Sequence, residues 1–204
     1  IEDSYDAYIE ASKMKNIDVV GIDAHIGSQI FDLQPFEDSL LRLEDLYHKL
    51  NDLGINIRFI DIGGGLGIKY KDDDIPPTKK EFAEKIIKTM KKINCSLILE
   101  PGRSLVGNAG YLISKVLYKK KSNQKNFLII DAGMNDILRP SLYNAYHKVS
   151  KSIQASDNSE IFDIVGPICE TGDVISYDTK LNDAKIGDNI IIHSEGAYGS
   201  VMSS

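Results

Sequence analysis

The sequence has few cysteines, no long apolar run and no excess of basic residues. Its 204 residues include two cysteines, Cys95 and Cys169, which give neither a disulfide framework nor the spacing of a metal site. Sparse cysteines suit a reducing compartment, so we expect a cytoplasmic protein. No stretch approaches the roughly 18 to 20 apolar residues needed to span a bilayer. We therefore expect no membrane partner, and no signal peptide is visible.

The charge balance is acidic. A formal charge of −6 argues against a nucleic-acid partner. The one basic cluster, residues 119–121 with Lys125, is interpreted as the solvated end of a hairpin. The four histidines show no paired ligand spacing, which argues against a metal site. With 42% apolar and 26% charged residues, the chain is typical of a globular protein with one or two cores.

The first half of the chain alternates apolar runs with segments of helical period. The runs at 19–28, 57–62 and 96–99 are interpreted as buried strands. Apolar residues at steps of three and four predict a helix over 36–50, ended by Gly54. A second helix is expected from Thr78, whose hydroxyl can form a capping box with Glu81. This alternation predicts a parallel sheet with its chemistry at the carboxyl ends of the strands.

The second half consists of short apolar runs separated by turn residues. No helix of ordinary length fits between most of them, so we expect a second, mainly antiparallel β domain. We place the domains at residues 1–105 and 106–204. The expected strands cover residues 111–118, 127–130, 162–168, 174–177 and 189–193.

Each of the three expected parallel strands ends in polar or glycine residues. Glu100 and Arg103 flank a rigid Pro-Gly turn, which on its own is more often a structured turn with a surface ion pair. The glycine run at 63–67 lacks the Lys-Ser/Thr ending of a nucleotide P-loop, but its N–H groups can hold a phosphate. With His25 and Ser28, the set fits a phosphorylated basic heterocycle such as pyridoxal phosphate.

Seven ordered motifs extend this interpretation over the whole chain. They are His-Ile-Gly-Ser-Gln at 25–29, Asp-Ile-Gly-Gly-Gly at 61–65, Glu-Pro-Gly-Arg at 100–103, Asp-Ala-Gly-Met-Asn-Asp at 131–136, Arg-Pro-Ser-Leu-Tyr at 139–143, Gly-Pro-Ile-Cys-Glu-Thr-Gly-Asp at 166–173 and Gly-Ala-Tyr-Gly-Ser-Val-Met-Ser-Ser at 196–204. In these the sequence resembles the pyridoxal-phosphate decarboxylases of the alanine-racemase fold, and among them the branch that acts on diaminopimelate.

The resemblance implies a fold and an activity. The fold would be the C-terminal part of a cofactor-binding (β/α)8 barrel followed by a mainly antiparallel β domain. The activity would be decarboxylation of meso-diaminopimelate to L-lysine, the last step of lysine biosynthesis, by a homodimer that shares its active sites. A decarboxylase of ornithine, arginine or carboxynorspermidine, and a non-catalytic homologue that acts as a binding partner, are the alternatives.

The resemblance also assigns roles to individual residues. Cys169 matches the proton donor supplied across the dimer interface. Without that context, Cys169 would be interpreted as a small buried hydrophobe, whereas Arg139 and Tyr143 could equally be a surface charge and a packing aromatic. The cofactor would contact His25, Ser28, Gly63, Gly64, Gly65, Glu100, Gly102 and Arg103. The substrate would contact Arg103, Arg139, Tyr143 and Glu170.

Three departures from the family pattern bear on activity. The lysine that forms the imine with the cofactor lies upstream of this region in the family, and the chain opens inside an expected helix at 4–15. The sequence stops at Ser204, before the tyrosine-asparagine pair that usually follows. Asp23 stands where many relatives carry histidine. We therefore expect an aggregation-prone fragment with an open parallel sheet, inactive by itself, from an active parent protein.

Overall fold

The computed structural model describes residues 2–153 and 158–204 and divides into two compact units. The first, here called the N-terminal unit, comprises Ile1–Gly67 and Ile75–Gly102. The second, here called the sheet unit, comprises Ile68–Asp74 and Arg103–Ser204. The division of the protein into domains at residues 105 and 106 stays a prediction. Among the described residues, no helix combines the length and the apolarity needed to cross a membrane.

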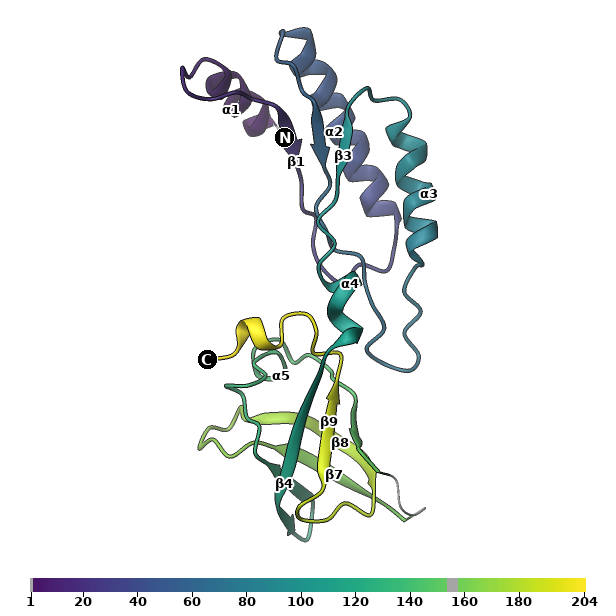
Figure 1. The fold of residues 1–204 in the computed structure, drawn as a ribbon, viewed down its shortest axis with the longest axis vertical. Coiled ribbons are helices and arrows are strands. Elements are labelled where there is room, and N and C mark those ends of the chain that lie inside the picture. Colours follow the sequence, from purple (N-terminus) through teal and green to yellow (C-terminus); the bar gives the residue numbers. More distant parts are fainter. Residues whose placement is uncertain (1, 154–157) are drawn as a thin grey trace. The chain divides into compact units, whose positions relative to one another are not determined.

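The N-terminal unit alternates helices and parallel strands, as the sequence predicts. Its three strands pair in parallel in the order β1-β2-β3, and α2 and α3 lie side by side along them (Figure 1). The elements are α1 (Glu2–Ser12), β1 (Gly21–Asp23), α2 (Gln34–Asp52), β2 (Phe59–Asp61), α3 (Lys79–Met90) and β3 (Ser96–Ile98). The observed α1 begins and ends slightly before the expected helix at 4–15.

The two long helices have the apolar stripe and the N-terminal cap that the sequence predicts. Helix α2 carries a proline in its first turn and buries one stripe at helical spacing, and Gly54, with a φ of 83°, follows its end. Thr78 caps α3, because its hydroxyl accepts from the N–H of Glu81 (3.1 Å) while the Glu81 carboxylate accepts from the N–H of Thr78 (2.7 Å). The stripe of α2 consists of Phe36, Leu40, Leu43, Leu46 and Leu50.

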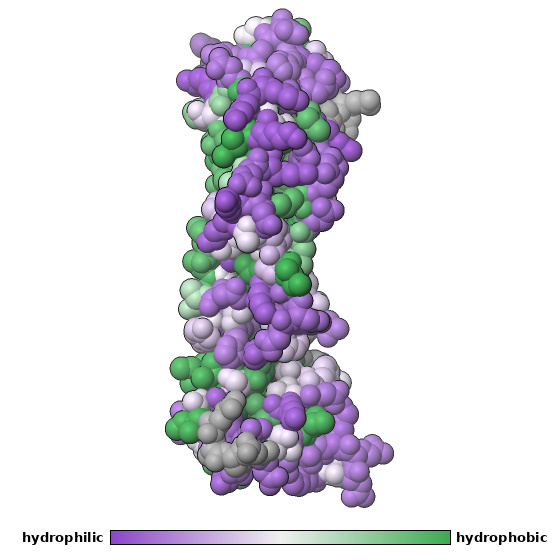
Figure 2. Space-filling view, turned by 90° about the vertical axis from the view of Figure 1, so that its right-hand side faces the viewer, coloured by the Kyte–Doolittle hydropathy of each residue, from purple (hydrophilic) through white to green (hydrophobic). Residues whose placement is uncertain are grey.

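The short parallel sheet is apolar against the helices and mixed on its other face. Ile22 and Ile60 are buried in the core that the helices cover. The prediction that 96–99 is a buried strand is wrong, since Ser96 is exposed and Ile98 and Leu99 are 40% and 42% exposed. The reason is that β3 is an edge strand of the described sheet, with one neighbour only. Apolar patches also interrupt the hydrophilic surface on the face shown in Figure 2.

The sheet unit is built on a six-stranded sheet in the order β6-β9-β4-β5-β7-β8. All neighbours pair antiparallel except β5 and β7, so the predicted mainly antiparallel fold is confirmed. The edge strands β6 and β8 approach each other, which nearly closes the sheet around one apolar core. The strands are β4 (Tyr111–Lys121), β5 (Asn126–Ile130), β6 (Val149–Lys151), β7 (Ser159–Val165), β8 (Val174–Asn182) and β9 (Asn189–His193).

Several strand ends differ from the sequence prediction. β7 ends at Val165, and the residues to 168 belong to the next loop, because the pairing of β7 with β8 stops at Val165 opposite Val174. β8 continues five residues beyond the expected end. Short elements without a clear periodic signal were missed: β6, the helices α4 (Arg103–Val106) and α5 (Arg139–Tyr143), and the 3-10 turns η1 (Gly107–Ala109) and η2 (Ser200–Met202).

The basic cluster does lie at the end of a hairpin, between β4 and β5. Three of its four lysines are paired with acidic side chains of β7, since Lys119 and Lys121 both contact the Glu160 carboxylate. Lys125 contacts Asp163 at 2.6 Å. The cluster therefore ties the hairpin to the neighbouring strand β7.

The Thr78 cap gives a first test of helix α3. Thr78→Ala should lower the free energy of unfolding by about 1 kcal/mol, because the N–H of Glu81 loses its acceptor. Thr78→Ser keeps the hydroxyl and should stay within about 0.5 kcal/mol of the native protein. Urea unfolding of the three proteins measures both changes, and an equal loss in the two variants would contradict the capping role.

The buried carboxylate of Asp163 gives a pH test. Burial raises the pKa of Asp163, but the Lys125 ammonium at 2.6 Å and the N–H of Asp178 at 3.0 Å outweigh it, so the net pKa is lowered. The ionised carboxylate therefore stabilises the folded state fully above about pH 4, which is the pKa of an aspartate in the unfolded chain. This stabilisation is lost as the pH falls through the lower pKa of the folded state. The stability difference between the native protein and Asp163→Asn should shrink on acidification, as urea unfolding at several pH values would show. A difference independent of pH would contradict it.

Candidate functional site

Parallel pairing brings the ends of the three strands into one row. The backbone ladder continues past the strands, since the N–H of Glu100 donates to the carbonyl of Gly63 at 2.9 Å. Within the strands, the last register pair of β1 and β2 is Asp23 with Asp61. His25 lies beside Gly63, because a Cβ built on Gly63 would meet the imidazole Nδ1 at 2.8 Å. The structure thus brings together His25, the glycine run and Glu100, as predicted.

The glycine run is held by close backbone contacts. Gly63 and Gly65 have positive φ values of 66° and 105°, a region that side chains other than glycine rarely adopt. A Cβ on Gly64 would overlap the carbonyl oxygen of Glu100, and one on Gly65 would overlap that of Gly27. The N–H of Ile30 donates to the Gly65 carbonyl at 2.9 Å. A side chain at Gly64 or Gly65 would therefore collide with the neighbouring backbone segment.

Two N–H groups of the predicted phosphate nest already have acceptors within the chain. The N–H of Gly63 donates to Oδ1 of Asp61 at 2.8 Å, and that of Gly64 donates to Nδ1 of His25 at 3.2 Å. The second bond fixes the exposed imidazole ring of His25, with Nδ1 as the acceptor. Ser28 is also exposed and lies two residues before the segment that pairs with Gly65.

Three carboxylates converge at the strand ends. Oxygen atoms of Asp23, Asp61 and Glu100 all lie within 4.8 Å of one another. Three acidic groups at this distance repel one another unless a positive charge joins them. The negative potential favours a protonated ring nitrogen beside Glu100, so these carboxylate acceptors fit a basic heterocycle. Sequence interpretation singled out Glu100 but took Asp23 only as a departure from the family.

The predicted substrate and proton-donor residues lie in the sheet unit. Arg139 begins α5 and is 8% exposed, whereas Tyr143 at its end is 63% exposed. Arg139 is therefore not a surface charge and Tyr143 is not a packing aromatic, which removes both alternatives. Cys169 and Glu170 are exposed on the loop between β7 and β8. The exposed thiol likewise excludes a buried hydrophobe.

One hydrogen bond joins this loop to α5. Ser141 donates its hydroxyl proton to the carbonyl oxygen of Gly172 at 2.6 Å. Buried Asp173 shapes the loop, because Oδ2 accepts from the N–H of Ile168 and Oδ1 from that of Met134, both at 2.7 Å. Sequence interpretation missed Asp173 as an organiser, although it ends the 166–173 motif.

The two predicted arginines share one tyrosine. Arg103 donates from Nη1 to the hydroxyl of Tyr70, and its Cζ lies 4.8 Å from the ring centre of Tyr198. The Cζ of Arg139 lies 5.1 Å from the ring centre of Tyr70. Aromatic faces attract guanidinium groups, so Tyr70 holds the two like charges near each other. Tyr70 and Tyr198 were not singled out from the sequence, where each is one of ten tyrosines.

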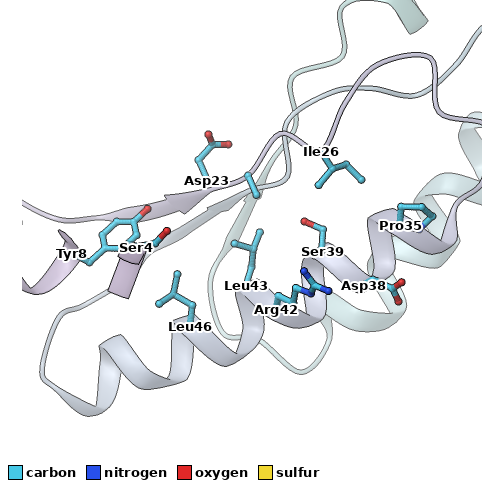
Figure 3. Close-up of a pocket in the computed structure, with 11 residues that line it drawn as sticks. Ser4, Tyr8, Asp23, Ile26, Pro35, Asp38, Ser39, Arg42, Leu43 and Leu46 are labelled. Atoms are coloured by element: carbon cyan, nitrogen blue, oxygen red, sulfur yellow. The ribbon is translucent and has the colours of Figure 1, made fainter. Parts of the chain in front are cut away.

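A pocket in the N-terminal unit borders the acidic cluster, since Asp23 is among its lining residues. It opens between α2 and the end of β1, with Arg42 and Ser39 of α2 beside it (Figure 3). None of the predicted cofactor or substrate residues lines it. The strand ends of the N-terminal unit and the two arginines of the sheet unit are therefore the stronger candidates, each described within its own unit.

Comparison with known proteins decides the family. The model for the pyridoxal-dependent decarboxylase family, C-terminal sheet domain, matches residues 5–196. This chain belongs to the pyridoxal-dependent decarboxylase family. It is 44% identical over 204 residues to a diaminopimelate decarboxylase of Aquifex aeolicus, and 45% identical over 204 residues to one of Zymomonas mobilis. In both cases the alignment covers 100% of this chain.

Solved structures of the family agree with the fold. The crystal structure of diaminopimelate decarboxylase from Helicobacter pylori, complexed with L-lysine, superposes with a TM-score of 0.93 at 38% identity. The superposition covers 100% of this chain and 50% of that one. The chain also spans only 49% and 48% of the two relatives named above, about half their length.

The glycine run gives a test of the site's geometry. Gly64→Ala should lower the free energy of unfolding by about 1 to 3 kcal/mol, because the new methyl group overlaps the Glu100 carbonyl and forces the strand ends apart. Gly172→Ala is a matched control, since its Cβ would make only ordinary contacts at 3.9 and 4.0 Å. Thermal and urea unfolding measure both, and equal stability of the two variants would contradict the close approach.

Proposed function

We propose that the protein containing this chain is a pyridoxal-phosphate-dependent carboxy-lyase that converts meso-diaminopimelate to L-lysine. The family relationship supports the reaction class. The observation that supports diaminopimelate as the substrate is the nearly complete burial of the Arg139 guanidinium in the sheet unit. A buried cation with a bidentate donor set suits a terminal carboxylate. Ornithine, arginine and carboxynorspermidine carry no carboxylate at the remote end.

The cofactor would be held at the strand ends of the N-terminal unit. Bound pyridoxal phosphate supplies an electron sink for the bond that loses carbon dioxide. Glu100, with Asp23 and Asp61 nearby, would keep the ring nitrogen protonated, and the ring of His25 would lie against the cofactor ring. Ser28, Gly65 and Gly102 would bind the phosphate side, with Arg103 close to both phosphate and substrate. Gly63 and Gly64, whose N–H groups donate to Asp61 and His25, would line that side with their backbone.

The remaining residues would bind and protonate the substrate. Arg139 and Tyr143 would receive the carboxylate that is retained, and Glu170 the amino group at the same end. The thiol of Cys169 would give its proton to the α-carbon after carbon dioxide leaves. Its exposure suits delivery across an interface, as in a homodimer with shared sites. A cytoplasmic location is part of the same proposal.

The full-length protein with pyridoxal phosphate should release lysine and carbon dioxide from diaminopimelate, but no carbon dioxide from ornithine, arginine or carboxynorspermidine. Arg139→Ala should lower kcat/KM for diaminopimelate by about 100-fold or more, the effect of truncating one partner of a buried charge pair. Product analysis and steady-state kinetics measure both.

Arg58→Ala is the matched control, because Arg58 forms an exposed ion pair with Asp18 and should leave the kinetics unchanged. Turnover of ornithine, arginine or carboxynorspermidine in place of diaminopimelate, unaffected by Arg139→Ala, would move the protein to that class of decarboxylase. Binding of pyridoxal phosphate without turnover of any of these substrates would indicate a non-catalytic homologue.

A further inference from the structure

Arg139 is held in place by a buried histidine, His147, which lies outside the residues proposed to contact cofactor or substrate. The side chain of His147 is fully buried, and its Nε2 lies 2.6 Å from Nη1 of Arg139. A guanidinium has donors only, so Nε2 of His147 must be the acceptor. The imidazole is therefore neutral at this nitrogen and carries its proton on Nδ1.

The contacts of Nδ1, on the opposite side of the imidazole, indicate the same tautomer. Nδ1 of His147 lies 2.9 Å from the carbonyl oxygen of His193 and 2.6 Å from Oε1 of Glu195. The carbonyl accepts the hydrogen bond, so Nδ1 carries the proton, and the Glu195 carboxylate lies within ion-pair distance without forming a hydrogen bond of its own. The tautomer is thus fixed from both sides, and the ring can neither flip nor rotate without losing these contacts.

Glu195 is buried beside the ring, and its Oε1 makes no hydrogen bond within the described residues, so the contact with His147 is one of charge and proximity. The side chain of Glu195 is 7% exposed, and its N–H donates to the carbonyl of Gly110 at 2.9 Å. A Cβ on Gly199 would overlap the Glu195 carboxylate, so the glycine leaves the space that this group occupies. The buried negative charge of Glu195 and the positive charge of Arg139 lie on opposite sides of one neutral imidazole, which reduces the cost of burying either.

Tyr70 completes the support. Its ring packs edge-on against His147, with centroids 5.4 Å apart, and its face lies under the guanidinium of Arg139. His147 therefore contacts one edge of the guanidinium while Tyr70 contacts its face. Within the described residues, no other hydrogen-bond acceptor meets the guanidinium, so its remaining donors stay available for a ligand.

We infer that His147, oriented by Glu195 and the His193 carbonyl, is a positioning residue that sets how Arg139 receives the remote carboxylate of the substrate. This inference rests on the proposed role of Arg139. His147 acts through Arg139 and does not itself touch the substrate. Its substitution should therefore affect recognition of the remote carboxylate and leave the rest of substrate binding unchanged.

Two amide substitutions separate positioning from packing. In His147→Gln, the side-chain oxygen can replace Nε2 as the acceptor for Arg139. In His147→Asn, the shorter amide reaches only the position of Nδ1, so Arg139 loses its acceptor. Both variants are neutral and both lose the imidazole ring. His48→Asn, on the exposed surface of α2, is the matched control.

The test measures binding to the full-length protein loaded with pyridoxal phosphate. Calorimetry gives the Kd of D-2-aminopimelate and of D-2-aminoheptanoate, whose amino-acid centre has the configuration that loses carbon dioxide when meso-diaminopimelate becomes L-lysine. The two ligands differ only in a carboxylate or a methyl group at the remote end. The native protein and His48→Asn should prefer aminopimelate. His147→Asn should reduce that preference by about 10- to 100-fold, the range for a hydrogen bond to a charged group, and His147→Gln by less than about threefold.

Other outcomes overturn the inference. An equal loss of affinity for both ligands in both variants would make His147 a packing residue only. A preference unchanged in His147→Asn, or absent from the native protein, would also overturn it. Binding does not require turnover, so a protein that discriminates as expected but releases no lysine from diaminopimelate would refute the proposed function and not the positioning role.

Discussion

Parallel pairing of three short strands is the constraint on which the N-terminal unit depends. Parallel neighbours end at the same edge of a sheet, so the residues that follow each strand meet there whatever their separation in sequence. The backbone bond between Glu100 and Gly63 extends this pairing into the loops. Gly64 permits the approach, since any side chain there would overlap the carbonyl of Glu100. The acidic cluster and the His25 ring take their positions from this register.

A buried positive charge has a similar influence in the sheet unit. Arg139 is removed from water, and a guanidinium in that position needs an acceptor and a counter-charge. The acceptor comes from His147, the counter-charge from Glu195 beyond it, and the stacking surface from Tyr70. These residues come from three separate stretches of chain, which the sheet brings together. The arrangement leaves the cation fixed rather than mobile, as recognition of a carboxylate requires.

The sequence predicted elements best where a periodic pattern and a local signal agreed. Helix α3 is one case, because Thr78 and Glu81 form the capping box that their spacing indicates. The run at 96–99 is the opposite case, since its apolar composition predicts burial but its place at the edge of the described sheet leaves Ile98 exposed. Composition records which residues can be buried, whereas the neighbours that bury them are a property of the assembled sheet.

The sequence by itself determined the alternation of helix and strand, the antiparallel second half and the family motifs, because periodicity, caps and ordered motifs are local along the chain. Only the tertiary structure decided that Arg139 is buried and Tyr143 exposed on the same short helix. It also decided that His147 and Glu195 meet, 48 residues apart. Such contacts depend on how distant segments pack, and packing distances across a sheet leave no periodic trace in the sequence.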